Sequence, residues 1–177
     1  MRFSLTSASQ TSILAKNGKK WIKVGNWGTQ EMFRGRFEYT IDSKGRVSIP
    51  VKFRELLAEK YDDRLILTNF DRCLVAYPYE EWRILEDKVS SLSMVKKEAK
   101  AFQRFFISGA TECPIDKLGR ILIPPTLRGY AQLEKNVVFA GLVKKFEIWS
   151  RERWAEEIGR SQENFEGISE ALAELGL

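Results

Sequence analysis

Aspartate, glycine and arginine recur at one fixed spacing in two short segments of the chain. The first segment is Asp42-Ser-Lys-Gly-Arg46, and the second is Asp116-Lys-Leu-Gly-Arg120, 74 residues later. Arginine is the side chain best matched to the O6 and N7 acceptors of guanine, whereas basic side chains at other positions suit phosphate oxygens. We therefore expect Arg46 and Arg120 to contact DNA bases. Four neighbouring basic residues are expected to contact phosphates, namely Lys44, Lys117, Arg34 and Arg36.

The same segments allow two other interpretations. Asp42 and Arg46 could form an ion pair within the turn, and we favour such a structural role for Asp42 and Asp116. The two aspartates could instead act as paired catalytic carboxylates, but the turn motif already explains each of them. The sequence contains no histidine, which removes the commonest general base and metal ligand. We expect neither enzymatic activity nor a metal or cofactor.

Both segments lie within a longer internal repeat. Residues 42–54 recur as residues 116–128, with Asp, Gly, Arg, Ile, Pro and a final Arg at identical offsets. In each copy, Asp-x-x-Gly predicts a type I turn between the two strands of a hairpin, with Gly45 and Gly119 at positive φ. Pro50 and Pro124 are then expected in the first turn of a helix. The predicted strands span residues 37–41, 46–49, 65–68 and 73–77 in the first copy and 111–115, 120–123, 137–140 and 146–149 in the second.

Apolar periodicity predicts further helices after each copy. Residues 79–106 have helical spacing, with a break expected at residues 90–93. Residues 151–177 predict one amphipathic helix or two, with Gly159 and Gly167 as weak points. Trp82, Trp154 and the C-terminal apolar stripe exceed the needs of a small core, so we expect subunit contacts there.

Composition indicates a globular protein of one domain or two small ones. The chain has 177 residues, of which 44% are hydrophobic and 30% are charged. Its formal net charge is +5, and residues 151–177 are acidic, so the positive charge lies on the preceding part of the chain. No apolar run approaches the roughly 20 residues that span a bilayer, and residues 1–15 lack the apolar stretch of a secretory signal. We expect a cytoplasmic location, with Cys73 and Cys113 as buried apolar residues.

The repeated motif resembles the MraZ family of bacterial transcriptional regulators. The resemblance rests on Met32-Phe-Arg-Gly35, on the two turns with their prolines, and on Lys145-Phe-Glu-Ile-Trp149. It implies an α+β fold in which two tandem AbrB-like swapped-hairpin β units form a pseudo-dimeric barrel, with connecting and C-terminal α-helices. It also implies a ring-shaped homo-oligomer at the nucleoid. Such a ring binds repeated G-rich boxes in double-stranded DNA upstream of its own division and cell-wall operon and usually represses it.

The resemblance also assigns roles to residues of the two turns. The family's DxxxR pair corresponds to Asp42 with Arg46 and to Asp116 with Arg120. The second turn departs from the first, because Lys117-Leu118 replaces Ser43-Lys44, so its outward chemistry can differ. AbrB-like folds also serve as antitoxins that bind a toxin through a disordered tail. The amphipathic C-terminal segment argues against that alternative here.

We expect the chain to divide into a first AbrB-like domain at residues 32–82, a helical connector at 83–107, a second AbrB-like domain at 108–154 and a C-terminal helix at 155–177. Residues 1–31 have no counterpart in the resemblance. They are a flexible basic arm, an extra packed segment, or upstream sequence translated from a start codon set too early, and we favour the last. Trp27-Gly28 requires TGGGG in the gene, so repeated TGGG-type boxes before codon 32 would support translated operator DNA.

Overall fold

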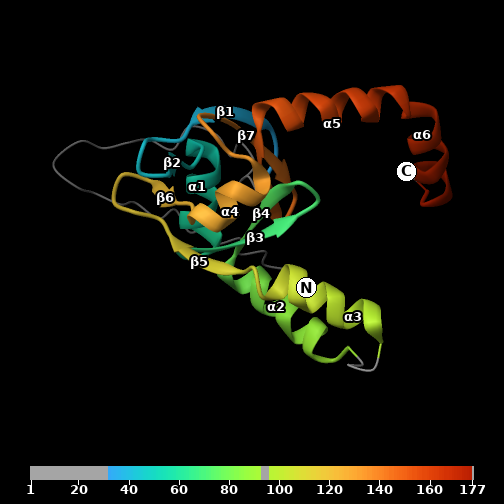
Figure 1. Cartoon of the computed structure of the whole chain (residues 1–177), viewed down its shortest axis with the longest axis horizontal. Helices are drawn as coiled ribbons and strands as arrows, with labels where there is room; N and C mark the ends of the chain where they lie inside the picture. The colour runs from blue at the N-terminus through green and yellow to red at the C-terminus, as the bar shows by residue number, and fades with distance from the viewer. Residues whose placement is uncertain (1–31, 93–95, 177) are drawn as a thin grey trace, which may run out of the picture.

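The computed structural model describes residues 32–92 and 96–176, so the hypothesis about residues 1–31 lies outside the described residues (Figure 1). Each copy of the repeat contains two short strands, one helix and two longer strands, in that order. The first copy comprises β1 (Arg36–Thr40), β2 (Arg46–Ser48), α1 (Val51–Lys60), β3 (Arg64–Phe70) and β4 (Cys73–Pro78). The second comprises β5 (Thr111–Pro114), β6 (Arg120–Leu122), α4 (Pro125–Ala131), β7 (Asn136–Leu142) and β8 (Lys145–Ser150).

In the part of the chain that the structure describes, all strand pairs are antiparallel and form two sheets. The larger sheet has six strands in the order β1-β7-β8-β4-β3-β5, and β2 pairs with β6 in a separate two-stranded ribbon. Exchanging every strand for its counterpart in the other copy reverses the six-strand order and leaves the same pairs. The chain therefore has an approximate two-fold axis, which passes between β4 and β8 and between β2 and β6.

The first two strands of each copy pair with strands of the other copy. β1 pairs with β7, β5 pairs with β3, and β2 pairs with β6. The prediction of a hairpin ladder within each copy is therefore wrong: the turn reverses the chain, but among the described residues no ladder joins β1 to β2 or β5 to β6. The reason is burial, because Val47 and Ile121 face each other across the β2–β6 ribbon at 1% exposure each. The exchange of strands agrees with the swapped arrangement that the resemblance implies.

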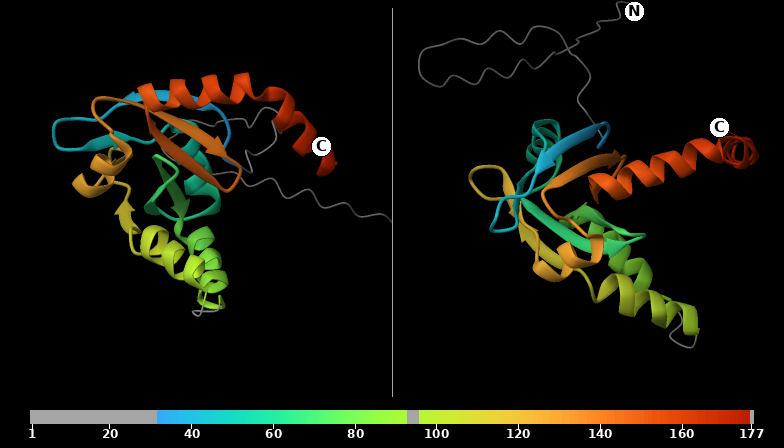
Figure 2. Two further views of the ribbon diagram at one scale, coloured as in Figure 1. Left: turned by 45° about the vertical axis from the view of Figure 1, so that its right-hand side comes forward. Right: turned by 45° about the horizontal axis from the view of Figure 1, so that its top comes forward.

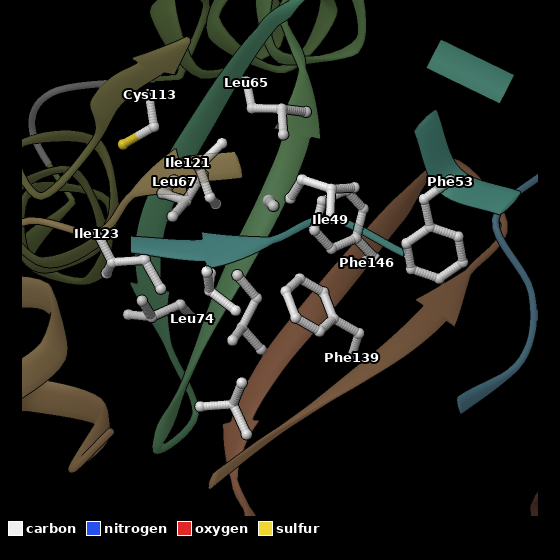
Figure 3. Close-up of a cluster of buried hydrophobic side chains, with 14 of the residues drawn as sticks. Ile49, Phe53, Leu65, Leu67, Leu74, Cys113, Ile121, Ile123, Phe139 and Phe146 are labelled. Atoms are coloured by element: carbon white, nitrogen blue, oxygen red, sulfur yellow. The ribbon is translucent and has the colours of Figure 1, made fainter. Parts of the chain in front are cut away.

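One hydrophobic core joins the β2–β6 ribbon to the six-stranded sheet (Figure 3). The ribbon and the residues that follow it contribute Val47, Ile49, Ile121 and Ile123, all fully buried. Full burial of each such side chain is worth about 1.5–3 kcal/mol. The sheet and α1 supply the buried partners, among them Phe53, Leu65, Leu67, Leu74, Phe139 and Phe146. Within the described residues the strands do not close into one hydrogen-bonded barrel, since β1 and β5 form the edges of the sheet.

The helix after each turn begins one residue later than predicted. Pro50 and Pro124 precede α1 and α4 as their N-terminal cap residues, and Pro125 occupies the first turn of α4. α1 buries Phe53 and two leucines, and α4 continues through Gly129 to Ala131, after which Gln132 caps the helix in a left-handed conformation. The two helices therefore occupy equivalent places, although α4 is the shorter.

The remaining helices extend away from the sheets. α2 (Tyr79–Ser90) ends where a break was predicted, and α3 (Lys97–Phe102) continues into the π-helix η1 (Gln103–Ile107). The C-terminal segment forms two helices, α5 (Arg151–Glu163) and α6 (Phe165–Glu174), which meet at Asn164 rather than at either predicted glycine. No helix within the described ranges is long and apolar enough to cross a membrane.

The structure tests the subunit contact predicted at Trp82 and the burial predicted for Cys73 and Cys113. Trp82 is 2% exposed and stacks on Phe106 with ring centroids 5.6 Å apart, so the prediction of a subunit contact at Trp82 is wrong. Its indole is already buried within the chain. Cys73 and Cys113 are free and buried, as predicted. Burial raises the pKa of the Cys113 thiol to about 11, so both cysteines behave as apolar core residues.

Candidate nucleic-acid interface

The aspartate of each turn holds the backbone of that turn. Asp42 Oδ1 accepts hydrogen bonds from the N–H groups of Lys44 and Arg46, each at 2.9 Å. In the second copy, Asp116 Oδ1 accepts from the equivalent N–H groups at 2.8 and 3.0 Å. An Asp at the first position of a turn stabilises it in this way without help from the rest of the fold. The local sequence thus explains the shape of both turns.

The second carboxylate oxygen of each aspartate orients the arginine that follows. Asp42 Oδ2 accepts from Arg46 Nε at 2.7 Å and from Nη2 at 2.7 Å. The Arg46 N–H, followed by the Arg46 guanidinium, lowers the pKa of Asp42 from 3.8 to about 2. Asp116 binds Arg120 in the same manner, and the guanidinium lowers the pKa of Asp116. Since a guanidinium has five N–H donors, three remain on each arginine for another acceptor.

The β2–β6 ribbon brings the two arginines onto one face. Arg46 lies opposite Leu122, and Arg120 lies opposite Ser48. These four side chains alternate with the buried central pair and therefore point outward. A step of two residues along a strand and one strand spacing separates the Cα atoms of Arg46 and Arg120 by roughly 8 Å. The turns project from the side of the molecule opposite α5 and α6 (Figures 1 and 2).

Each turn is also held by the other copy of the repeat. The Gly119 carbonyl accepts a hydrogen bond from Ile49 N–H at 2.9 Å, and the Gly45 carbonyl accepts one from Ile123 N–H at 3.0 Å. Gly45 has a φ angle of 84° and Gly119 one of 73°, which confirms the predicted positive values. These bonds continue the ribbon past its named strands and anchor the base of each turn.

Two further arginines pack across these glycines, and the sequence motifs did not assign them a role. Arg128 of α4 places its guanidinium against Gly45, and Arg54 of α1 does the same against Gly119. Arg54 Nε and Arg128 Nε each donate to a backbone carbonyl five residues earlier, at 3.2 Å. The signal that could have found them is the final arginine of the repeat, which occurs at the same offset in both copies.

A family model described as "MraZ protein, putative antitoxin-like" matches residues 32–105 and again residues 106–175. The chain belongs to the MraZ family. The tandem matches correspond to the two copies of the repeat, whose strands are interleaved in the structure. In this chain, each of the two matched units therefore contributes one turn arginine to the β2–β6 ribbon.

Curated relatives support the same membership. A protein of a Thermoanaerobacter species is 49% identical over 146 residues, which is 82% of this chain and 100% of the relative. Proteins of Caldanaerobacter subterraneus and Ligilactobacillus salivarius are 49% identical over 141 residues and 47% identical over 146 residues. The first match covers 80% of this chain and 96% of the Caldanaerobacter protein, and the second covers 82% of this chain and 100% of the Ligilactobacillus protein. All three are named "Transcriptional regulator MraZ", a name for regulators rather than enzymes.

The structure separates the predicted phosphate-contacting residues into two groups. Lys44 and Lys117 are exposed at the turns, near the arginines of the ribbon. Arg36 lies at the far end of β1, where its guanidinium is 5.3 Å from the ring centroid of Trp154. Arg34 comes two residues before Arg36 in the chain. The structure therefore does not place Arg34 and Arg36 beside the β2–β6 ribbon. The basic face around the ribbon instead includes Arg54 and Arg128.

The turn aspartates do not form a catalytic pair. Asp42 and Asp116 belong to opposite ends of the β2–β6 ribbon, and each carboxylate is occupied by its own arginine. Across residues 32–92 and 96–176, no three His, Cys, Asp or Glu side chains cluster as metal ligands would. The arrangement instead presents oriented guanidinium groups beside exposed lysines.

Proposed function

We propose that this member of the MraZ family is a sequence-specific DNA-binding transcriptional regulator that inserts the β2–β6 ribbon into the major groove. The observation that carries the proposal is the placement of Arg46 and Arg120 on the outward face of one ribbon. The major groove, about 12 Å wide, admits a two-stranded ribbon. Two arginines whose Cα atoms are roughly 8 Å apart on one ribbon can contact bases within a single short box.

The turn aspartates prepare the arginines for this contact. Asp42 fixes the guanidinium of Arg46 through Nε and Nη2, so less side-chain freedom is lost when the remaining N–H groups bind guanine O6 and N7. Lys44 and Lys117, at the turns, would contact the flanking phosphates and set the position of the ribbon. The preferred operator is a set of repeated G-rich boxes upstream of the protein's own division and cell-wall operon, whose transcription the bound protein represses.

Repeated boxes suit a protein that presents many copies of the same ribbon. We place the protein at the nucleoid, in the cytoplasm, as a ring-shaped homo-oligomer in which each subunit contacts one box. A single ribbon makes few base contacts and binds weakly by itself. Binding of one subunit raises the effective concentration of the next ribbon at the adjacent box, so the ring binds far more tightly than one subunit.

The antitoxin alternative finds support in the description of the family model. An antitoxin of this fold class would bind its toxin through a C-terminal segment that becomes ordered on binding. In this chain the C-terminal segment forms two amphipathic helices, α5 and α6. The helical C-terminus and the oriented arginines together favour DNA as the partner.

Alanine substitutions can separate base recognition from attraction by charge. Arg46→Ala is expected to cost roughly 1–3 kcal/mol on operator DNA and to relax base preference at its contact. Lys44→Ala is expected to weaken binding to operator and random DNA alike and to lower the salt slope by about one. Fluorescence anisotropy titrations on both DNAs at several salt concentrations measure these differences.

Lys88→Ala is the control, because it removes the same charge from an exposed position of α2 far from the turns. It should leave operator binding unchanged. The proposal is refuted by an Arg46→Ala, Arg120→Ala double variant that is folded and assembled and still binds the operator as tightly and selectively as the parent.

A further inference from the structure

The two halves of the β2–β6 ribbon differ at their outward positions. Under the approximate two-fold axis, Arg46 corresponds to Arg120, but Ser48 corresponds to Leu122. Leu122 is 56% exposed, and Leu118 at the tip of the second turn is 67% exposed. The core does not require Leu122, because Ile121 and Ile123 on either side of it already fill the buried positions. Leu118 and Leu122 thus give the second half of the ribbon an exposed apolar character, where the first half has Lys44 and Ser48.

Leu122 lies directly beside Arg46. Ile123 N–H donates to the Gly45 carbonyl, and Ile49 N–H donates to the Gly119 carbonyl. The facing pairs at the two ends of the ribbon are therefore hydrogen-bonded pairs. Since such pairs alternate in antiparallel ladders, Arg46 and Leu122 form a non-hydrogen-bonded pair. Cα atoms of those pairs are about 4.5 Å apart, with the side chains close together. Stacked bases are about 3.4 Å apart. When Arg46 contacts one base, the side chain of Leu122 would therefore lie against the adjacent base.

We infer that Leu122 recognises the C5 methyl group of a thymine next to the guanine bound by Arg46. Thymine presents this methyl in the major groove, where apolar side chains contact it. Ser48 is the counterpart of Leu122 and lies beside Arg120. Its hydroxyl can hydrogen-bond to donors or acceptors on a base, so it does not select for the thymine methyl. The pseudo-symmetric ribbon would then recognise an asymmetric box, with a thymine required on one side only. This inference rests on the proposed function and names the residue that gives its operator a direction.

Replacing thymine by deoxyuridine tests the inference, because uracil lacks only the methyl group. Each thymine of the operator is replaced in turn, in all boxes at once, and binding of the full-length protein is measured. The parent is expected to lose about fourfold or more in affinity at one thymine beside a guanine, given the worth of one buried methyl. Leu122→Ser should bind more weakly and lose this sensitivity. Ser48→Leu should gain a second sensitive position, related to the first by the two-fold axis.

Leu142→Ser is the matched control, because Leu142 is an exposed leucine at the end of β7, away from the ribbon. It should leave the deoxyuridine profile of the parent unchanged. The inference is overturned if no thymine is sensitive while Arg46→Ala still weakens operator binding. It is also overturned if Leu122→Ser changes the assembled mass, because Leu122 would then be a subunit contact. Equal binding by the parent and Arg46→Ala would instead reject the proposed function itself.

Discussion

Each turn aspartate has two tasks that its two oxygens divide between them. Oδ1 of Asp42 accepts backbone N–H groups and fixes the turn, while Oδ2 binds the guanidinium of Arg46. The structural role favoured for Asp42 and the DNA-contacting role proposed for Arg46 are therefore compatible. An arginine held by a carboxylate keeps three N–H donors in a fixed direction. The ion pair is a means of presenting the arginine rather than an alternative to its exposure.

Stability should depend on pH through Asp42. Folding lowers its pKa from 3.8 to about 2, so the folded state binds the proton less readily than the unfolded state. The ionised carboxylate therefore stabilises the fold fully above the unfolded pKa, and this contribution is lost as the pH falls through the folded value. Asp42→Asn should lower the free energy of unfolding at neutral pH, and its difference from the parent should shrink between pH 3.8 and about 2.

Urea denaturation at a series of pH values measures this difference. Glu170→Gln, at an exposed position of α6, serves as the control and should show little effect at any pH. A difference between Asp42→Asn and the parent that stays constant across the acid range would show that the charge of Asp42 does not stabilise the turn.

The strands of the β2–β6 ribbon have three residues each, too few to be stable as an isolated pair. Their stability comes from contacts at both ends that cross between the copies. Arg54 and Arg128 lie against the glycine of the opposite turn, and the carbonyls of those glycines extend the ladder. The element that would meet DNA is thus supported from both copies at once. Its geometry depends on helices α1 and α4 as much as on the turns.

Gly45→Ala should destabilise the protein for two separable reasons. An alanine at a φ of 84° costs about 1–2 kcal/mol, and its Cβ would lie 2.8 Å from the guanidinium carbon of Arg128. In an Arg128→Ala background the second cost disappears, so Gly45→Ala should then cost only the backbone part. A double-mutant cycle by chemical denaturation measures the coupling between the two positions.

Gly129→Ala is the control, because it is the same substitution at a position without either cost. Gly129 lies inside α4, and a Cβ there meets nothing within 4 Å, so alanine should stabilise by about 0.5–1 kcal/mol. Strict additivity of Gly45→Ala and Arg128→Ala would contradict the packing of the arginine across the turn.

At the scale of the whole molecule, the two copies form one interleaved body with a single main core. The central strands β4 and β8 pair with each other, and every first strand pairs with the other copy. The helices behave differently, because α5 and α6 extend away from the sheets (Figure 2). Phe165 and Leu175 of this extension are 66% and 76% exposed. An apolar stripe without cover inside the subunit is typical of a surface that meets another copy.

Phe165→Glu should therefore weaken self-association. By light scattering at micromolar concentration, the parent is expected to exceed the 20.5 kDa of one chain, and the variant should shift toward that mass. Leu142→Glu introduces the same charge at an exposed apolar residue of β7 and should leave the assembly intact. A monomeric parent, or equal dissociation of both variants, would contradict a subunit contact at α6.

The sequence by itself determined the features that depend on nearby residues. The repeated Asp-x-x-Gly spacing predicted both turns and their positive glycine φ angles, because the side chain and backbone that form a turn are within five residues of each other. The predicted strands on either side of α1 and α4 were found, most of them shifted or extended by a residue or two. The break in the connector and the burial of Cys73 and Cys113 also followed from local pattern and residue type.

Only the tertiary structure decided which strands pair and what surrounds the arginines. Because β2 and β6 each have one apolar central residue to bury, the sequence could not distinguish pairing within a copy from pairing between copies, and the shared burial of Val47 with Ile121 decided it. The same exchange placed Arg54 and Arg128 against the opposite turns and left Arg36 on Trp154. These contacts join residues far apart in the chain, and they depend on a buried core to which both copies contribute.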